Sequence, residues 1–442
     1  PRGLYVLFLT EMWERFSFYG MRALLVLFLV SSVNGENPGF GWTSSEALKL
    51  YGIYTFLVYL SSIPGGIIAD KYIGQKKAVI LGGLLLVAGH SILAFQSLFT
   101  FYVGLALIIA GVGCLKPNIS TMVGGLYPKG DDRRDKGFTI FYIGINVGAF
   151  LAGIITGYVG ETMGWHYGFG LAGIGMAAGL IIFLAGHKYL QGVGEATKSL
   201  SNEEQRQHNQ PLTTIEKDRV KVMLLSFLMI IVFWGAFEQA GGLMNLYASE
   251  KTNRIITFLN FTVPATWFQS VNSFFIITLG IPIAAFWFKW KQKGKEASSI
   301  FKIAIGLIIM GWGFLFMTAA SVQYQNEGSS AMTWLILAYM FHTIGELCAS
   351  PVALSYITKL APVKYASIMM GVYFAATGLG NYAAGWVGVW SQTAGELEIF
   401  TGIAIFCTLI GAIVIAMVKP LKRLAHGAED FSQETMSEAK PA

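Results

Sequence analysis

Four ionisable side chains stand inside an apolar stretch near the start of the chain. The stretch covers residues 4–30, which is longer than the roughly 20 residues needed to cross about 30 Å of hydrocarbon. It contains Glu11, Glu14, Arg15 and Arg22, which a helix with about 100° per residue places on one stripe. Because a charge in the bilayer centre is costly, this stripe cannot face lipid. Its charges form either structural ion pairs such as Glu11–Arg15 or part of a substrate and proton path, and we favour the path.

Later apolar stretches supply further polar side chains that are candidates for the same path. In chain order they are Lys116, Tyr142, Asn146, Trp234, Glu238, Gln269, Asn272, His342, Glu346 and Ser350. Pro117 follows the lysine and removes a backbone hydrogen bond in mid-membrane, which loosens that helix. Asparagines in spans often join helices, whereas membrane acids and bases indicate a functional site by default.

The charges inside the spans do not balance. The acids are Glu11, Glu14, Glu238 and Glu346, and the bases are Arg15, Arg22 and Lys116. One bound proton would neutralise this set, so the sequence predicts a site able to take up a proton. The proton belongs to the coupled group of carboxylates rather than to one assigned residue.

The composition is that of an integral membrane protein. The 442 residues are 54% hydrophobic and 13% charged, and they include 52 glycines, which allow helices to pack closely. The three cysteines all lie in apolar stretches, which argues against a disulfide framework or a metal cluster, and we expect no cofactor. No cleavable signal peptide is apparent, and because the chain starts without Met we expect a short N-terminal piece to be missing.

Hydropathy predicts an all-α membrane protein with twelve spans. They cover residues 4–30, 48–69, 77–97, 99–123, 137–160, 167–187, 219–243, 265–288, 300–321, 331–358, 365–391 and 396–418. The predicted organisation is an N-terminal six-helix bundle at 1–187, a linker at 188–218, a C-terminal six-helix bundle at 219–423 and a tail at 424–442. Ser201–Glu204 has the form of a capping box, so a short surface helix is expected in the linker.

Lysine and arginine gather in one alternate set of loops, around residues 71–77, 129–136, 188–221, 289–295, 359–364 and 419–423. The positive-inside rule therefore predicts that these loops, the linker, the tail and both termini are cytoplasmic.

Several motifs carry a resemblance to a known family. Residues 65–77 look like the loop motif that joins spans two and three in the major facilitator superfamily. Four further motifs, in the family's order, are Glu11-x-x-Glu14-Arg15-Phe16-x-x-Tyr19, Leu115-Lys116-Pro117-Asn118, Phe141-Tyr142-x-x-Ile145-Asn146-x-Gly148, and Gly345-Glu346 followed by Ser350-Pro351. With these, the chain closely resembles the proton-dependent oligopeptide transporter family, bacterial peptide symporters of the major facilitator superfamily.

The resemblance implies a role for each candidate residue. Arg22 and Lys116 would hold the peptide carboxylate, and Glu346 with Asn146 and Asn272 would hold its ammonium. The full set of candidate substrate-binding residues is Tyr19, Arg22, Tyr59, Lys116, Tyr142, Asn146, Trp234, Asn272, Glu346, Ser350 and Tyr373. The proton-coupling residues would be Glu11, Glu14, Arg15, Lys116 and Glu346, and the gate salt bridges Arg22–Glu238 and Lys116–Glu346.

Three departures from the family pattern concern the cavity and the linker. Phe237 stands where relatives often have a second acid, and Tyr373 stands where some bacterial relatives have Trp. Many bacterial relatives carry two extra helices between the halves, and residues 188–218 have no room for them. These helices are either absent from the protein or missing from the numbered chain.

The expected function is import of di- and tripeptides, coupled to protons by alternating access, in the bacterial inner membrane. The expected partners are peptides, protons and the lipid bilayer, with no nucleic acid and with a monomer as the functional unit. Alternatives are a symporter for nitrate or an amino acid, and a drug/proton antiporter. Nitrate has no ammonium to explain Glu346 opposite a basic pair. We do not expect an enzyme, because the sequence has no paired-histidine metal spacing, no Gly-x-Ser-x-Gly and no phosphate loop.

Overall fold

The computed structural model describes residues 1–95, 97–128, 131, 133–195, 212–362 and 366–428. Its long helices are α1 (Arg2–Val30), α2 (Ser44–Leu60), α4 (Gln75–Leu93), α5 (Leu98–Gly125), α6 (Arg133–Thr162), α7 (Trp165–Ala185), α9 (Thr214–Phe237), α11 (Trp267–Gln292), α12 (Ser299–Glu327), α13 (Met332–Leu360), α14 (Ala366–Ala394) and α15 (Glu396–Ala416). The predicted capping box at Ser201–Glu204 and most of the predicted tail lie outside the described residues.

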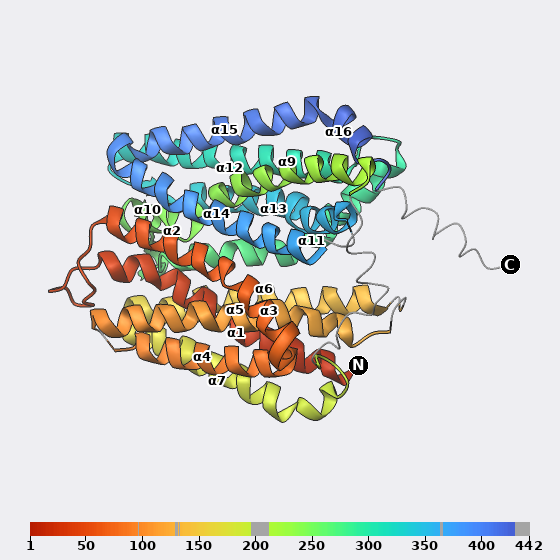
Figure 1. The fold of residues 1–442 in the computed structure, drawn as a ribbon. Coiled ribbons are helices and arrows are strands. Elements are labelled where there is room, and N and C mark those ends of the chain that lie inside the picture. The colour runs from red at the N-terminus through yellow and green to blue at the C-terminus, as the bar shows by residue number, and fades with distance from the viewer. Residues whose placement is uncertain (96, 129–130, 132, 196–211, 363–365, 429–442) are drawn as a thin grey trace.

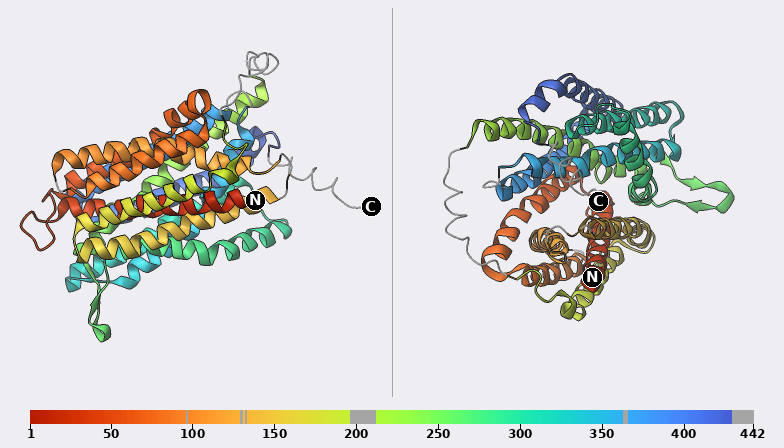
Figure 2. Two further views of the ribbon diagram at one scale, coloured as in Figure 1. Left: turned by 90° about the horizontal axis from the view of Figure 1, so that it is seen from below. Right: turned by 90° about the vertical axis from the view of Figure 1, so that its right-hand side faces the viewer.

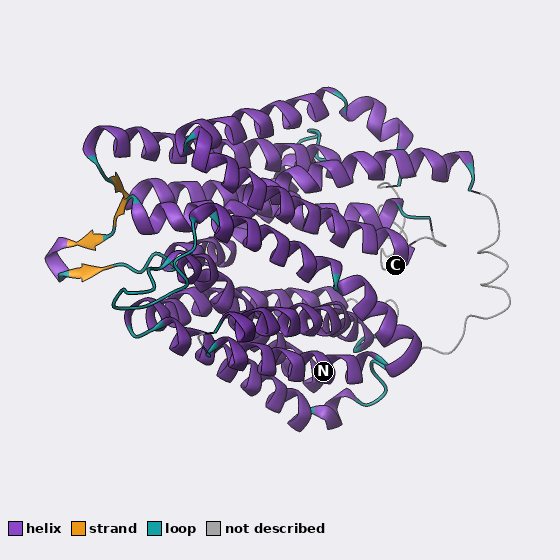
Figure 3. Ribbon diagram, turned by 60° about the vertical axis from the view of Figure 1, so that its left-hand side comes forward, coloured by secondary structure: helices purple, strands orange, loops and turns teal. Residues whose placement is uncertain are grey.

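Short elements connect the long helices. The helical ones are α3 (Ser62–Ile68), η1 (Ala69–Ile73), η2 (His187–Leu190), η3 (Glu238–Ala240), α10 (Leu243–Glu250), η4 (Thr257–Leu259) and α16 (Val418–Leu424). The strands are β1 (Thr252–Asn253), β2 (Ile255–Ile256), β3 (Phe261–Thr262) and β4 (Ser330–Ala331). β1 pairs in parallel with β4, whereas β2 and β3 form an antiparallel hairpin that protrudes from the molecule (Figure 3).

The predicted all-α membrane fold is confirmed. Ten helical segments of the described chain are long and apolar enough to cross a membrane. Helices α1 and α14 are 29 residues each, which is also long enough, and they cover most of the spans predicted at 4–30 and 365–391. In α1, the interrupting charges lower the hydropathy, and those charges are buried within the protein.

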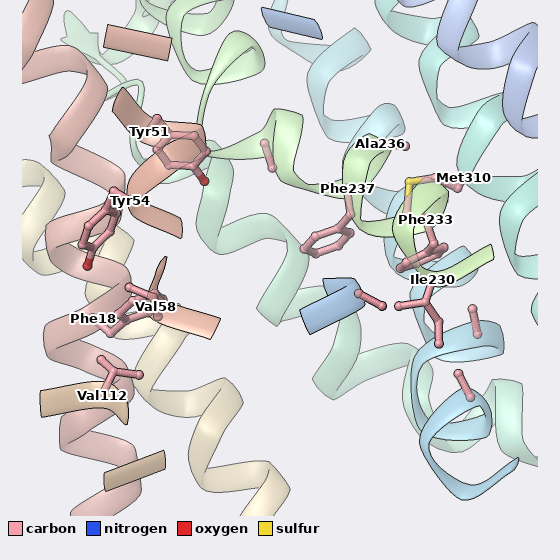
Figure 4. Close-up of a cluster of buried hydrophobic side chains, with 14 of the residues drawn as sticks. Phe18, Tyr51, Tyr54, Val58, Val112, Ile230, Phe233, Ala236, Phe237 and Met310 are labelled. Atoms are coloured by element: carbon pink, nitrogen blue, oxygen red, sulfur yellow. The ribbon is translucent and has the colours of Figure 1, made fainter. Parts of the chain in front are cut away.

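The helices form two groups that lie against each other. Figure 1 shows α1–α7 together on one side and α9–α16 on the other, and the right-hand view of Figure 2 shows the same separation. The buried apolar side chains of both groups belong to one cluster. In Figure 4, Phe18 on α1 and Val58 on α2 are part of it, and so are Ile230 and Phe233 on α9. The bounds predicted for the two bundles remain a proposal.

Pro1 and α16 lie at the same end of the molecule, here called the terminal end (Figure 1). The turn between α1 and α2, together with the β2–β3 hairpin, lies at the other end, here called the opposite end. Helices α2 and α14 cross between the two groups, where Gly52 and Gly385 meet so closely that a Cβ on Gly52 would lie 2.8 Å from the Cα of Gly385. Glycine at this crossing lets the two backbones approach.

Two local predictions are corrected by the structure. The predicted span at 219–243 lies within the candidate span Thr214–Glu250, but it is not one continuous α-helix. Helix α9 ends at Phe237, and the chain forms the short turn η3 and passes through Gly241 and Gly242 before α10. The motif predicted as a loop at 65–77 is helical as far as Ile73, and only Gly74, with φ at 79°, separates it from α4. Glycine adopts this positive φ without the steric cost that a Cβ would bring.

Candidate functional site

A polar cavity of about 190 Å³ lies between the two groups of helices. The first group contributes side chains from α1, α2 and α6, and the second from α9, η3, α11 and α13. Eleven candidate residues line it, namely Tyr19, Arg22, Tyr59, Tyr142, Asn146, Trp234, Glu238, Gln269, Asn272, Glu346 and Ser350. Residues far apart in the sequence are thus brought together at one place.

The cationic side of this cavity is Arg22 on α1. Its Nη1 lies 3.2 Å from Oε1 of Glu238, and its Nη2 donates to Oε1 of Gln269 at 3.3 Å. The Tyr51 hydroxyl donates to the other oxygen of Glu238 at 2.6 Å. The Arg22 guanidinium also lies over the Tyr19 ring, 5.0 Å from its centroid. The ion pair predicted between Arg22 and Glu238 therefore forms across the two groups, while its role as a gate stays a prediction.

The acidic side is Glu346 on α13. Asn272 on α11 donates to Oε2 of Glu346 at 2.9 Å, and the same amide nitrogen lies 3.0 Å from Oγ1 of Thr343. Asn146 lines the cavity from α6, but its amide nitrogen donates to the Tyr142 carbonyl of its own helix at 2.9 Å. A carboxylate held by one amide retains capacity to accept further hydrogen bonds from a bound cation.

A larger cavity of about 860 Å³ adjoins the first on the side of the terminal end. The structure places Lys116 and Tyr373 here rather than in the first cavity. The Lys116 ammonium lies 3.8 Å from the centroid of the Tyr59 ring. Among the described residues, no salt bridge joins Lys116 to Glu346, so the second predicted gate pair is not formed in this conformation. The cavities share the lining residues Tyr59, Ile145, Trp234 and Ser350.

Glu11, Glu14 and Arg15 form a buried cluster behind the cavities. The Arg15 Nε lies 3.0 Å from Oε1 of Glu11 and also contacts the Glu14 carboxylate. All three side chains are almost fully buried, and none of them lines either cavity. Lys116 interacts electrostatically with all three, and it also lines the larger cavity. It therefore connects the buried cluster with the polar interior.

Some residues of the site were not predicted. Tyr51 holds Glu238, and Tyr339 on α13 lines the cavity. Both are neutral, and tyrosines are common in membrane helices, so no sequence signal separates them from packing residues. His342, one turn before Glu346, is buried against Phe314, with the ring centroids 4.4 Å apart, and does not line the first cavity.

The sequence profile of the POT family matches residues 76–207 and 197–394. The chain belongs to the POT family. The family consists of transporters rather than enzymes, so the expectation that the chain is not an enzyme is confirmed.

Relatives of this POT-family chain match it over nearly its whole length. It is 34% identical to the peptide transporter YePEPT of Yersinia enterocolitica, covering 97% of the chain and 96% of the relative. It is 33% identical to a di-/tripeptide transporter of Lactococcus lactis subsp. cremoris, covering 96% of both. A crystal structure of a POT peptide transporter in complex with sulfate is 33% identical, covers 96% of both chains and superposes with a TM-score of 0.88. The fold is therefore that of POT transporters, membrane proteins of the major facilitator type.

Proposed function

We propose that this chain is a proton-coupled symporter that imports di- and tripeptides by alternating access. The observation that carries the proposal is the placement of Arg22 and Glu346 on opposite walls of one cavity between the two groups of helices. A small peptide is a zwitterion whose charged ends are separated by its backbone. An anchor of each sign fixes these ends through charge-assisted hydrogen bonds, whatever the side chains are.

Several aromatic side chains contribute to the walls of the cavity. Tyr19, Tyr59, Tyr142 and Trp234 line the cavity between the charged residues. Aromatic side chains combine apolar contact area with a polar edge in tyrosine and tryptophan, so they accommodate varied side chains. The relatives named as peptide and di-/tripeptide transporters support peptides as the substrate class.

The proposed proton path uses the buried charges. Protonation of a carboxylate weakens its ion pair and leaves the basic partner free to bind the peptide carboxylate. In this chain the affected bases are Arg22, paired with Glu238, and Lys116, close to the Glu11–Glu14–Arg15 cluster. Release of the peptide and the proton restores the ion pairs. Binding energy and protonation then act on the same equilibrium between two conformations.

The conformation supports alternating access between two groups that move against each other. At the opposite end the groups are joined by Arg22–Glu238 and by hydrogen bonds such as that from the Asn245 amide to the Ala23 carbonyl, at 2.9 Å. At the terminal end the larger cavity adjoins the site. With both termini cytoplasmic, as the loop charges predict, this conformation faces the cytoplasm. We propose residues 1–187 and 219–423 as the moving bundles of a monomer in the bacterial inner membrane.

The test is uptake of dialanine into proteoliposomes that have an acidic exterior. We expect accumulation above the external concentration, and its loss when a protonophore dissipates the gradient. An absence of gradient-dependent accumulation by the intact protein would falsify the coupling. Competition by tripeptides, nitrate and free amino acids separates a peptide symporter from the other solute classes, since only peptides should displace dialanine.

A further inference from the structure

A third cavity, which is polar, lies at the terminal end, away from the two central cavities. It has a volume of about 430 Å³ and is lined by the adjoining ends of α11, α12, α13 and α16. Its ionisable residues are Lys291, Lys295, Glu296, Lys302, Lys359 and Lys422. Five lysines from segments as much as 131 positions apart thus converge on a single hollow containing one acid. Loop lysines that serve only to orient a membrane protein have no need to converge in this way.

The N-terminus of α12 adds to the positive character of the cavity. Ser298, the N-cap of this 29-residue helix, makes no side-chain capping bond. Its hydroxyl is enclosed at the wall of the cavity. Ser298, Ser299 and Lys302 all line the cavity, so the first turn of α12 faces it. The helix dipole at such a terminus favours an anion.

Glu296 offsets only part of this charge. Its carboxylate accepts a hydrogen bond from the Ser298 backbone at 2.8 Å and another from the Lys422 ammonium at 3.0 Å. Burial raises the pKa of Glu296, but these hydrogen bonds outweigh it and hold the pKa below its usual value. Lys291 and Lys359 have exposed side chains and form no ion pair among the residues that the structure describes. Their ammonium groups remain available to a ligand.

The cavity adjoins a surface suited to the membrane interface. Trp287 and Trp290 lie on the last turns of α11, where Lys302 and Lys295 stack on their rings at 5.4 and 4.2 Å from the centroids. Tryptophan is enriched at the level of lipid headgroups. On the same part of α11, Phe286 is 51% exposed and Phe288 is 65% exposed. A basic hollow and an apolar, lipid-facing surface therefore lie side by side.

We propose that this cavity binds the phosphate of an anionic phospholipid headgroup, with the acyl chains lying along α11. The positive charge of the lysines and of the α12 N-terminus complements the negative phosphate, and the exposed phenylalanines provide apolar contact for the acyl chains. Basic pockets between membrane helices on the cytoplasmic side are suited to such headgroups. The inference does not depend on which solute the protein transports.

The test is native mass spectrometry of the purified protein titrated with phosphatidylglycerol and, separately, with phosphatidylcholine. We expect selective binding of phosphatidylglycerol and a loss of about tenfold in its affinity in Lys291→Gln/Lys359→Gln, because each basic group near the headgroup contributes to attraction. Glu296→Gln removes the one opposing charge and should tighten binding. The matched control is Lys136→Gln/Lys188→Gln, which removes two exposed lysines from the same end of the other group. It should leave the affinity unchanged.

Three results would overturn the proposal. The first is equal affinity for the two lipids. The second is a control variant that loses as much affinity as Lys291→Gln/Lys359→Gln. The third is stabilisation by inorganic phosphate alone that equals the stabilisation by phosphatidylglycerol, since this would make the cavity a site for free anions. Melting temperatures of all variants in phosphatidylcholine check that each is folded, and Glu296→Gln provides a second variant whose expected effect has the opposite sign.

Discussion

The carboxylate of Glu161, at the end of α6, accepts a hydrogen bond from the backbone N–H of Thr266, at the start of α11, at 2.9 Å. The same carboxylate also accepts from the Ala265 N–H at 3.0 Å and from the Thr266 hydroxyl at 2.7 Å. The Arg254 Nη1 lies 3.7 Å from its Oε2. One acid of the first group thus caps a helix of the second. The contact lies at the opposite end, beyond the Arg22–Glu238 pair, so the closed end is held at two levels.

The first prediction concerns this cap. Glu161→Gln should shift the population toward a conformation open at the opposite end, because hydrogen bonds to a charged group contribute about 1.5–3 kcal/mol. Distances between spin labels at Met163→Cys and Phe258→Cys, both at exposed positions, measure the shift. The labelled variants are made in a protein in which the three buried native cysteines are replaced, so that only the introduced cysteines carry a label. Glu36→Gln, an exposed acid at the same end, is the control. Identical distance distributions in Glu161→Gln and the parent protein would show that the cap does not hold this end closed.

The second prediction concerns the coupling of Tyr51 to Glu238. Because the Tyr51 hydroxyl donates to Glu238 at 2.6 Å, Tyr51→Phe should destabilise the protein by about 1–3 kcal/mol. In a Glu238→Gln background the same change should cost clearly less, since the charged acceptor is gone. Thermal unfolding in detergent of the two single variants and the double variant measures the coupling. Tyr102→Phe, at an exposed tyrosine, is the control. Additive losses would exclude the coupling.

The third prediction concerns Glu346 and rests on the proposed peptide substrate. Glu346→Gln has the same shape and can still accept from Asn272, which donates to the native carboxylate at 2.9 Å, but it has no charge. Dialanine affinity should fall about tenfold or more, because a charge-assisted bond to the ammonium is lost. N-acetyl-dialanine, which has no ammonium, should bind the parent and the variant with similar affinity. Competition binding with both peptides measures the difference. Equal losses for the two peptides would mean that Glu346 does not recognise the ammonium.

The fourth prediction concerns the contact between α2 and α14. Gly52→Ala places a Cβ 2.8 Å from the Cα of Gly385, and because backbone cannot yield as a flexible side chain does, the helices must separate. Such overpacking costs about 1–3 kcal/mol, so the melting temperature should fall. Gly66→Ala is the matched control, since a Cβ there meets nothing within 4 Å. If the melting temperature fell equally in both variants, the close approach of α2 and α14 at Gly52 would not be the cause of the destabilisation.

Much of the fold was predictable, because membrane spans are defined by local composition. The span predicted at 331–358 is the helix Met332–Leu360, and the span predicted at 396–418 is Glu396–Ala416. The break of α9 at Phe237 was missed because Gly241 and Gly242 stand among apolar residues, so hydropathy continues where the backbone turns. The β2–β3 hairpin was missed because its strands are only two residues long.

The site was predictable where charge is involved. Glu238 and Glu346 stand out in apolar stretches, and both line the central cavity. Tyr51 and Glu161 were not singled out, because their importance comes from partners on the other group of helices. Which helix faces which is decided by tertiary packing, and a single sequence carries no local signal for it. For the same reason, the sequence does not indicate that Lys116 lines the adjoining larger cavity and not the cavity that contains Arg22 and Glu346.

The wall that the two central cavities have in common links occupancy to exit. Both cavities are lined by Tyr59, Ile145, Trp234 and Ser350. A bound molecule that leaves the smaller cavity toward the terminal end therefore passes side chains that it already contacted while bound. A smaller residue at Trp234 would both reduce the contact with the bound molecule and widen the passage between the two cavities. Substitutions at these four positions therefore change the affinity for the bound molecule and its rate of release together.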